Sequence, residues 1–336
     1  NQIKGFGEYG FPESHAASFA LLVYLSAWLK CHEPSAFYCG LLNSLPMGFY
    51  SHSQLIQDAR RHQIVIKPID VQHSQWDHAL EGTNLKPDAH PAIRLGTRLI
   101  KGLDKDSGLR IEKAVKEKPF TSIDELAIRA GVNDQNMRFL ARAGALKSLS
   151  GNRHQAHWDV AGIKRPLPLT KISSNATRDS SLRKKTVVRP EPSAQKNLIS
   201  DYRYTGFTLG SHPMCLIKND GEWSKYTTAE KLANARSGQF IRIAGLVTGR
   251  QRPSTASGII FMTIEDETGN INVVIWTGVL EKFRSAVLQG QLLKIKGVVE
   301  REGAVIHVVA GHIEDASHLF TNMTKNNLDL KSRDFH

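Results

Sequence analysis

Four residues have side chains suited to holding single-stranded nucleic acid: Arg250, Arg252, Phe261 and Trp276. Arginine guanidinium groups pair with phosphates and stack on bases, and aromatic rings offer flat faces on which bases stack. The alternative for each residue is burial in a protein core. We expect both arginines in a loop over 250–258, where they would contact the nucleic acid. Replacing both with alanine would then weaken single-strand binding by about 1–3 kcal/mol.

The segments that contain and flank these residues are predicted to form a small β-barrel. Five segments have the alternation and β-branched content of strands: 239–249, 258–265, 270–276, 291–300 and 304–310. A short helical pattern, 279–288, lies between the third and the fourth. Five strands with a helix in that gap is the order of an OB-fold, although another small barrel is the alternative. The sequence therefore predicts a five-stranded OB-fold β-barrel over 238–316.

The positive charge of the chain is concentrated in its middle. The net charge is +12, yet residues 91–160 hold 13 lysines and arginines against 8 acidic residues, and residues 161–200 hold 9 against 2. A localised basic zone next to a predicted OB-fold indicates a phosphate backbone as partner. A solvated charged surface is the alternative, and it fits an even spread of charge better.

Composition limits the remaining functional classes. No run of 18 apolar residues is present, so the sequence predicts no membrane span. Three cysteines, Cys31, Cys39 and Cys215, are few and far apart, which fits a reducing cytoplasm. They lack metal-ligand spacing, so we expect no metal site. Because the chain opens on Asn1 in mid-motif, we expect it to be a piece of a longer polypeptide.

Residues 1–70 read as helices followed by a short extended segment. Ser14 is the expected N-cap of a long helix, and residues 16–30 are apolar on nearly every side. A helix of that kind is predicted to be buried in a larger body. Ser14 and His15, at the start of this helix, could also help to hold a nucleotide phosphate; the alternative is that Ser14 only caps and His15 only packs.

Residues 71–160 read as a helix-hairpin-helix module that grips duplex DNA. Gly102 permits a tight turn, and Lys101 and Lys105 lie on either side of the place where backbone N–H groups can receive a phosphate. The usual second hairpin glycine is replaced by Asp104, which can cap the next helix but would repel a phosphate at that point. A plain helical connector is the alternative.

Three further segments complete the predicted organisation. Residues 161–200 are predicted to be a flexible basic linker, residues 201–237 a connector, and residues 317–336 a tail. His212 and Pro213 lie in the connector, and a turn is a better interpretation of this pair than a catalytic histidine.

Several motifs resemble one enzyme family. They are Phe6-Gly-Glu-Tyr-Gly-Phe-Pro-Glu-Ser-His-Ala16, Tyr24-Leu-Ser-Ala-Trp-Leu-Lys30, Phe37-Tyr-Cys-Gly-Leu-Leu-Asn-Ser44 and the terminal Ser332-Arg-Asp-Phe-His336. The first three resemble the end of the fingers domain of bacterial C-family DNA polymerases, the DnaE-type α subunits of DNA polymerase III. The pair Pro12-Glu13, where the replicative branch usually has Asn-Lys, and the terminal motif resemble the error-prone (ImuC) branch.

The resemblance implies a role for this chain within a larger enzyme. It would be the C-terminal, DNA-binding half of an error-prone DNA-directed DNA polymerase, comprising the end of the fingers, the helix-hairpin-helix module and the barrel. In such an enzyme, two Mg²⁺ ions on palm carboxylates catalyse nucleotidyl transfer from deoxynucleotide triphosphates. Those carboxylates would lie before Asn1, so we expect no catalytic residue and no bound cofactor in this chain.

The resemblance also implies partners: primer-template duplex, single-stranded template, companion mutasome proteins and, through these, the sliding clamp, in the bacterial cytoplasm at the nucleoid. Two alternatives remain. One is a stand-alone DNA-binding protein built from a helix-hairpin-helix and an OB-fold. The other is a fragment of the replicative α subunit.

Overall fold

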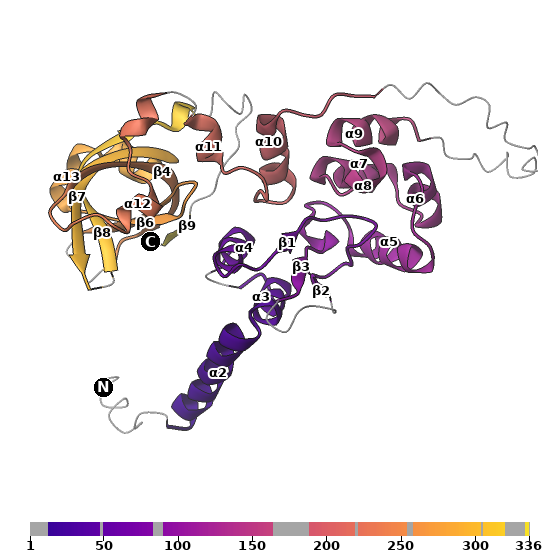
Figure 1. Cartoon of the computed structure of the whole chain (residues 1–336), viewed down its shortest axis with the longest axis horizontal. Helices are drawn as coiled ribbons and strands as arrows, with labels where there is room; N and C mark the ends of the chain where they lie inside the picture. The colour runs from indigo at the N-terminus through magenta and orange to yellow at the C-terminus, as the bar shows by residue number, and fades with distance from the viewer. Residues whose placement is uncertain are drawn as a thin grey trace, which may run out of the picture. The chain divides into compact units, whose positions relative to one another are not determined.

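The computed structural model describes residues 13–47, 50–82, 90–163, 188–218, 221–253, 258–303, 305–319 and 333–335. The chain divides into two compact units (Figure 1). One consists of residues 1–192 with 204–209, and the other of residues 193–203 with 210–336. Each unit has its own apolar core, and each is described by itself.

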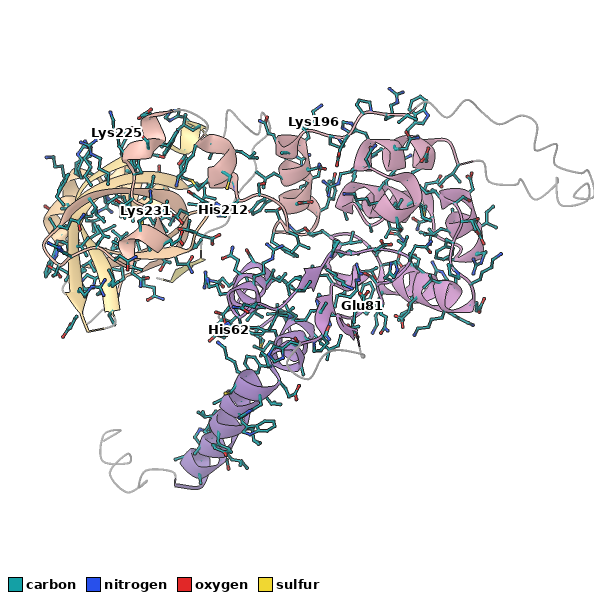
Figure 2. The ribbon with its side chains drawn as sticks, in the orientation of Figure 1. His62, Glu81, Lys196, His212, Lys225 and Lys231 are labelled. Atoms are coloured by element: carbon teal, nitrogen blue, oxygen red, sulfur yellow. The ribbon has the colours of Figure 1, made fainter. Side chains whose placement is uncertain are left out.

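The first unit begins with three helices and a small sheet. These elements are α2 (Glu13–His32), α3 (Pro34–Asn43), α4 (His52–Arg61), β1 (Ile66–Lys67), β2 (Ala79–Glu81) and β3 (Ala92–Arg94). The central strand β3 pairs in parallel with β1 and antiparallel with β2. Glu81 (Figure 2) lies 2.7 Å from Nε of Arg94 and 2.9 Å from Nζ of Lys67, so one carboxylate ties all three strands together.

Helix α2 differs from the prediction that it would be buried. Its large apolar side chains are 40–67% exposed: Phe19, Leu21, Leu22, Val23, Tyr24, Leu25, Trp28 and Leu29. Near the C-terminal end of α2, Nζ of Lys30 lies 3.1 Å from the carboxylate of Asp58 on α4. Because apolar residues occupy every side of the helix, contacts at one end cannot bury them.

Five helices follow the small sheet. They are α5 (Lys105–Glu117), α6 (Ile123–Arg129), α7 (Asp134–Ala143), α8 (Lys147–Ser150) and α9 (Arg153–Ala161). Four of them begin at a residue whose side chain accepts a hydrogen bond from the backbone N–H three residues later: Asp104, Ser122, Asn133 and Asn152. Ile111, Leu126, Met137 and Leu140 are fully buried between these helices.

The predicted flexible linker is described only in part. Residues 164–187 lie outside the described residues, including the basic run 183–185. After them the chain packs on α9: the backbone N–H of Arg189 donates to Oε1 of Gln155, and the Arg189 carbonyl accepts from the Asn152 amide. Helix α10 (Ala194–Tyr204) then occupies the end of the segment that we expected to be flexible.

The second unit is a closed five-stranded barrel. Its strands are β4 (Phe240–Gln251), β5 (Ile260–Glu265), β6 (Asn270–Ile275), β7 (Leu292–Glu302) and β8 (Val305–Asp315). Antiparallel pairs join β4 to β5, β5 to β6, β7 to β8 and β4 to β7. One parallel pair joins β6 to β8 and closes the ring (Figure 1). This is OB-fold topology, as the sequence predicted.

Helices lie in the predicted gap between the third and fourth strands of the barrel. They are α13 (Thr277–Lys282) and α14 (Arg284–Gln289). Leu280 of α13 and Val287 of α14 pack in the barrel core with Met262 and Val273. The helices therefore cover one end of the apolar interior that the strands enclose.

A sixth strand, β9 (Arg333–Phe335), pairs with the barrel. It lies parallel to the end of β4, over Gly249–Gln251. On its other side, this stretch of β4 pairs with β5. The pairing of β4 with β7 ends earlier, at Leu246, which leaves that edge of β4 to β9. The sequence predicted only a C-terminal tail over residues 317–336.

Candidate nucleic-acid interface

The outward surface of β4, β5 and β6 carries one predicted aromatic residue, Phe261, and the other, Trp276, directly follows β6. Phe261 on β5 stands opposite Gln251 on β4 and opposite Val274 on β6. Successive residues of a strand face opposite sides of a sheet. Met262 and Val273, one step along their strands, are accordingly buried in the barrel core. Residues in register with Phe261 therefore lie on the outer face.

Phe261 and Trp276 are both available to a ligand in this structure. Phe261 is 42% exposed and Trp276 is 54% exposed. Their burial in the barrel core, the alternative that the sequence left open, is excluded. Exposed aromatic rings are the side chains on which single-stranded bases stack, so the predicted role of Phe261 and Trp276 stays a prediction. We call this surface, Gln251, Phe261, Asn272, Val274 and Trp276, the outer aromatic face.

The prediction for Arg250 is wrong. Its side chain is buried, with 7% of the residue exposed. Its Nε donates to the Val287 carbonyl at 2.6 Å, and its Nη2 donates to the carbonyl of Gly290. Strand β4 runs through Gln251 instead of ending at 249, so Arg250 is a strand residue on the inner side. Its guanidinium joins β4 to the end of α14 and cannot meet a ligand.

Arg252 is placed differently, although it is only two residues away. It is exposed and follows the last residue of β4. The rest of the predicted loop, 254–257, lies outside the described residues. Arg252 is therefore accessible at the edge of the outer aromatic face, and its predicted contact with phosphate stays a prediction.

In the first unit, the hairpin at Gly102 has the predicted turn. The φ angle of Gly102 is +88°, a conformation that residues with a side chain rarely adopt. A Cβ atom at this position would also stand 2.7 Å from the ring of Phe139 on α7. Glycine is therefore required both by the backbone and by the close approach of α7.

Asp104 caps α5, as the sequence predicted. Its Oδ1 accepts a hydrogen bond from the backbone N–H of Ser107 at 2.7 Å, and its Oδ2 accepts one from the amide of Asn136. The N–H of Ser107 and then the Asn136 amide hold the pKa of the Asp104 carboxyl below its usual value. The carboxylate is thus charged and fixed at the start of α5, where other hairpins have a glycine.

The two lysines of this hairpin are exposed, but one side of the turn is occupied. The backbone N–H of Lys101 donates to the carbonyl of Tyr204 at 2.8 Å. Gly206 lies beside the Lys101 side chain, since a Cβ atom there would come within 3.7 Å of its Nζ. Lys105, the first residue of α5, stands on the other side of the turn. The duplex-binding role of Lys101, Gly102 and Lys105 stays a prediction.

Basic residues also surround Gly144, in the second helical unit of the predicted duplex-binding module. This glycine ends α7 with a φ angle of +79°. Arg153 lies against it and donates from its Nη2 to the Ala143 carbonyl. Burial lowers the pKa of His157, and the positive charge of Arg142 lowers it further. The spacing of Gly144 and Lys147 repeats that of Gly102 and Lys105.

The predicted nucleotide-proximal residues are described only in part. The side chain of Ser14 lies outside the described residues. His15 is exposed, and the centre of its ring lies 4.4 Å from that of Phe19, one turn further along α2. A role for Ser14 and His15 near a nucleotide stays a prediction.

His212 (Figure 2) is a structural residue, as the sequence favoured. Its Nδ1 accepts a hydrogen bond from the backbone N–H of Met214, which caps α11 (Pro213–Ile217). Its Nε2 lies 2.9 Å from Oε1 of Glu265, and both side chains are largely buried. With both ring nitrogens engaged inside the second unit, His212 holds α11 to the end of β5.

The described residues offer neither a membrane span nor a metal-binding cluster. No helix in this part of the chain has the length and apolar content needed to cross a membrane. In the same residues, no three His, Cys, Asp or Glu side chains come together to hold a metal ion.

Comparison with protein-family models identifies both nucleic-acid modules. A helix-hairpin-helix motif model matches residues 63–156. A model described as an OB-fold nucleic acid binding domain matches residues 241–316.

Curated relatives align with the whole chain. A protein named error-prone DNA polymerase from Pseudomonas fluorescens is 47% identical over 336 residues, and one from Pseudomonas aeruginosa is 48% identical over 335 residues. The chain is thus similar over its whole length to error-prone DNA polymerases. The alignments cover 100% of this chain but 31% of each of these polymerases, so the chain spans about a third of their length.

Solved structures resemble part of this chain. The second OB-fold domain of replication protein A from Methanococcus maripaludis is 15% identical, over 25% of this chain and 90% of that one, with a TM-score of 0.21. Similarity at this level does not bear on function.

Proposed function

We propose that this chain is the DNA-binding portion of an error-prone DNA polymerase that acts in translesion synthesis during DNA repair. The helix-hairpin-helix module would grip the primer-template duplex, and the barrel would hold single-stranded template. The observation that carries the proposal is the 47% identity with error-prone DNA polymerases along all 336 residues. The chemistry of the exposed residues is consistent with it, because bases stack on rings such as Phe261 and Trp276.

The polymerase activity itself would reside elsewhere in the parent polypeptide. The chain spans 31% of its relatives, so most of such an enzyme lies outside these residues. The Mg²⁺ ions and palm carboxylates that the family resemblance implies would be there, together with the site for deoxynucleotide triphosphates. Companion proteins, the sliding clamp and a cytoplasmic, nucleoid-associated location belong to the same proposal.

The exposed helix α2 fits this arrangement. Its apolar side chains lie on every side and are 40–67% exposed in this chain. A contiguous apolar surface of this kind marks a contact with another protein surface. In the parent polymerase, α2 would be covered by the remainder of the fingers.

A titration tests the proposal. Fluorescein-labelled single-stranded and primed-template DNA are titrated with the chain at several salt concentrations, and anisotropy is recorded. We expect binding to both probes, weakening as salt rises, because released counterions drive binding to phosphates. Absence of salt-sensitive binding to either probe would contradict the proposal.

A stand-alone DNA-binding protein is the second candidate, because both family models describe nucleic-acid-binding modules and neither names a polymerase. Primer extension by the full-length parent on an undamaged and on a lesion-containing template separates the candidates. Extension past the lesion supports the error-prone polymerase, extension that stops at the lesion supports the replicative enzyme, and no extension on either template supports the stand-alone protein.

A further inference from the structure

The outer aromatic face continues around the barrel onto β8, β7 and the start of β4. Phe261 stands opposite Val274, and Val274 stands opposite Val309 of β8. Val309 stands opposite Val298 of β7, and Val298 stands opposite Phe240, the first residue of β4. Residues directly opposite one another on paired strands share a face of the sheet. These five residues, which we call the apolar row, therefore form one line on the outside of the barrel.

Side-chain burial shows that the new part of the apolar row faces outward. Phe240 is 61% exposed, Val298 is 40% exposed, and Val309 is half-buried. The next residues along the same two strands, Ile241 and Val299, are buried in the barrel core. The alternation expected of strands is therefore present on both β4 and β7. The apolar row thus ends, as it begins, with an exposed phenylalanine.

Basic residues lie along one side of the apolar row. Arg242 comes two residues after Phe240 on β4 and is exposed. It stands opposite Lys296, which is also exposed and comes two residues before Val298 on β7. Lys296 stands in turn opposite His312 of β8, another exposed residue. Because residues two apart on a strand share a face, Arg242 and Lys296 place positive charge directly beside the apolar row.

The other side of the apolar row differs in charge. There, Glu300 of β7 stands opposite His307 of β8, and Oε2 of Glu300 lies 3.0 Å from Nε2 of His307. This side therefore carries a carboxylate, whereas the side of Arg242 and Lys296 carries positive charge. A line of apolar surface with cations on one side matches a single nucleic-acid strand, in which bases and phosphates lie on different sides of the chain.

We propose that single-stranded DNA held on the outer aromatic face continues along the apolar row, with Phe240 as a further stacking platform and Arg242 and Lys296 as phosphate contacts. This inference rests on the proposed function of the barrel. Neighbouring strands lie about 4.8 Å apart, so Phe240 lies roughly 19 Å from Phe261 along the row. Because rings stack on any base and cations contact the backbone, binding along the row has no sequence preference.

A protein partner is the other occupant that such a surface could take, because aromatic residues and arginine are also enriched in protein interfaces. Two observations favour DNA. The apolar row is continuous with the surface that is predicted to stack bases, and the charged residues at Arg242 and Lys296 are cations, which suits a polyanion. If a protein were the occupant, substitutions along the row would leave the affinity for DNA unchanged.

Anisotropy titrations of single variants of the 336-residue chain test the stacking role. The probe is a fluorescein-labelled deoxythymidine oligonucleotide of about 15 nucleotides, close to the upper limit for one OB-fold. Phe240→Ala is expected to weaken binding roughly 5- to 150-fold, the range for the loss of one stacked base. Phe240→Tyr keeps a ring and should bind as the unmodified chain does. Val298→Ala shortens an aliphatic side chain in the same row and should change the affinity little.

The salt dependence of binding tests the phosphate contacts. Arg242→Ala and Lys296→Ala are each expected to lower the slope of log K against log salt by about 0.7, the value for one phosphate on a single strand. The matched control is Lys231→Ala, because Lys231 (Figure 2) is an exposed lysine of the same unit on α12 (Ala229–Leu232), outside the apolar row and its basic side. Since all these side chains are exposed, the melting temperature of each variant should stay unchanged.

The outcomes separate this inference from the proposed function. If the unmodified chain does not bind the oligonucleotide, the proposed function fails, and the inference fails with it. If the chain binds, but Phe240→Ala binds equally well and the slopes for Arg242→Ala and Lys296→Ala are unchanged, the path along the apolar row is refuted. The proposal for the barrel then stands, and the row is left to a protein partner. Weaker binding by Phe240→Ala that Phe240→Tyr restores, together with the reduced slopes, supports the inference.

Discussion

The amide of Asn136 on α7 donates a hydrogen bond to the carboxylate of Asp104, the residue that caps α5. Asn136 is 3% exposed, and its amide also lies 2.9 Å from the Ser107 hydroxyl. The first hairpin is thereby fixed to α7, whose end forms the second turn at Gly144. A residue that looks unsuited to a phosphate-binding hairpin therefore has a structural role.

Replacing Asp104 with alanine should destabilise the first unit. The cap of α5 is lost, which costs about 1–2 kcal/mol, and the buried amide of Asn136 loses an acceptor. Urea unfolding monitored by circular dichroism measures the change. Asp106→Ala is the control, since Asp106 is exposed on the same turn, and it should change the free energy of unfolding much less.

The Asp104 carboxylate also predicts a pH dependence. Its pKa in the folded chain is lowered, so the folded state favours the charged form. The stability that it contributes is present above the unfolded pKa of about 3.9 and is lost as pH falls through the lower folded value. In Asp104→Asn this acid-dependent loss should be smaller. Equal unfolding free energies of the two proteins from pH 7 to pH 2 would argue against the capping interaction.

The same asparagine substitution tests the effect of charge on duplex binding. Asparagine also caps helices, so Asp104→Asn should keep the cap of α5 and remain folded, although its single amide oxygen cannot accept from both Ser107 and Asn136. Removing a negative charge beside the lysines should tighten binding to a duplex about two- to fivefold at low salt, the size of one exposed charge interaction. The gain should shrink as salt rises. Unchanged affinity would place the phosphate contact away from this hairpin.

Substitution of Arg250 should lower the stability of the barrel, whereas substitution of Arg252 should lower its affinity for single-stranded DNA. Arg250→Ala removes two buried hydrogen bonds from a charged group and should destabilise the barrel by about 2–3 kcal/mol. Arg252→Ala should leave stability nearly unchanged and weaken single-strand binding by about 1–3 kcal/mol if its guanidinium stacks on a base. Thermal melting and anisotropy titration of both variants measure the two effects. A stable Arg250→Ala protein with weakened DNA binding would reverse this assignment.

Phe261 and Trp276 should each contribute to single-strand affinity. Alanine at either position should weaken binding by about 1–3 kcal/mol, the value of one stacked base. Because both rings are about half exposed, the melting temperature should change little. Val298→Ala, on an exposed site of β7, is the control for a general loss of surface. Normal affinity of the double variant Phe261→Ala with Trp276→Ala would exclude the outer aromatic face.

Helix α2 should tolerate polar residues in this chain. Leu22 and Leu25 are 57% and 48% exposed, so Leu22→Gln with Leu25→Gln should increase solubility without lowering the free energy of unfolding. Leu42→Gln, at a fully buried site on α3, should unfold the first unit. In the full-length parent, the α2 variant should instead lose stability, because there the helix would be covered. Equal stability of the parent with and without the substitutions would contradict that covering.

The sequence by itself determined the elements and their order. Alternating apolar residues specified five strands with a helical segment in the right gap, and the capping residue Asp104 specified where α5 begins. These features depend on residues close together in the chain, because strand alternation and N-caps are local. The two nucleic-acid modules, and the exposed positions of Arg252 and Phe261 within the barrel unit, agree with that reading.

Only the tertiary structure decided which way individual residues face. A break in register between Val247 and Gly249, where β4 pairs with β5, sets the phase that turns Arg250 inward. Its hydrogen-bond acceptors lie on residues 287 and 290, and no local pattern links them to position 250. The pairing of β9 with β4 joins residues more than 80 positions apart. Such contacts depend on the closure of the barrel, which a pattern of neighbouring residues does not encode.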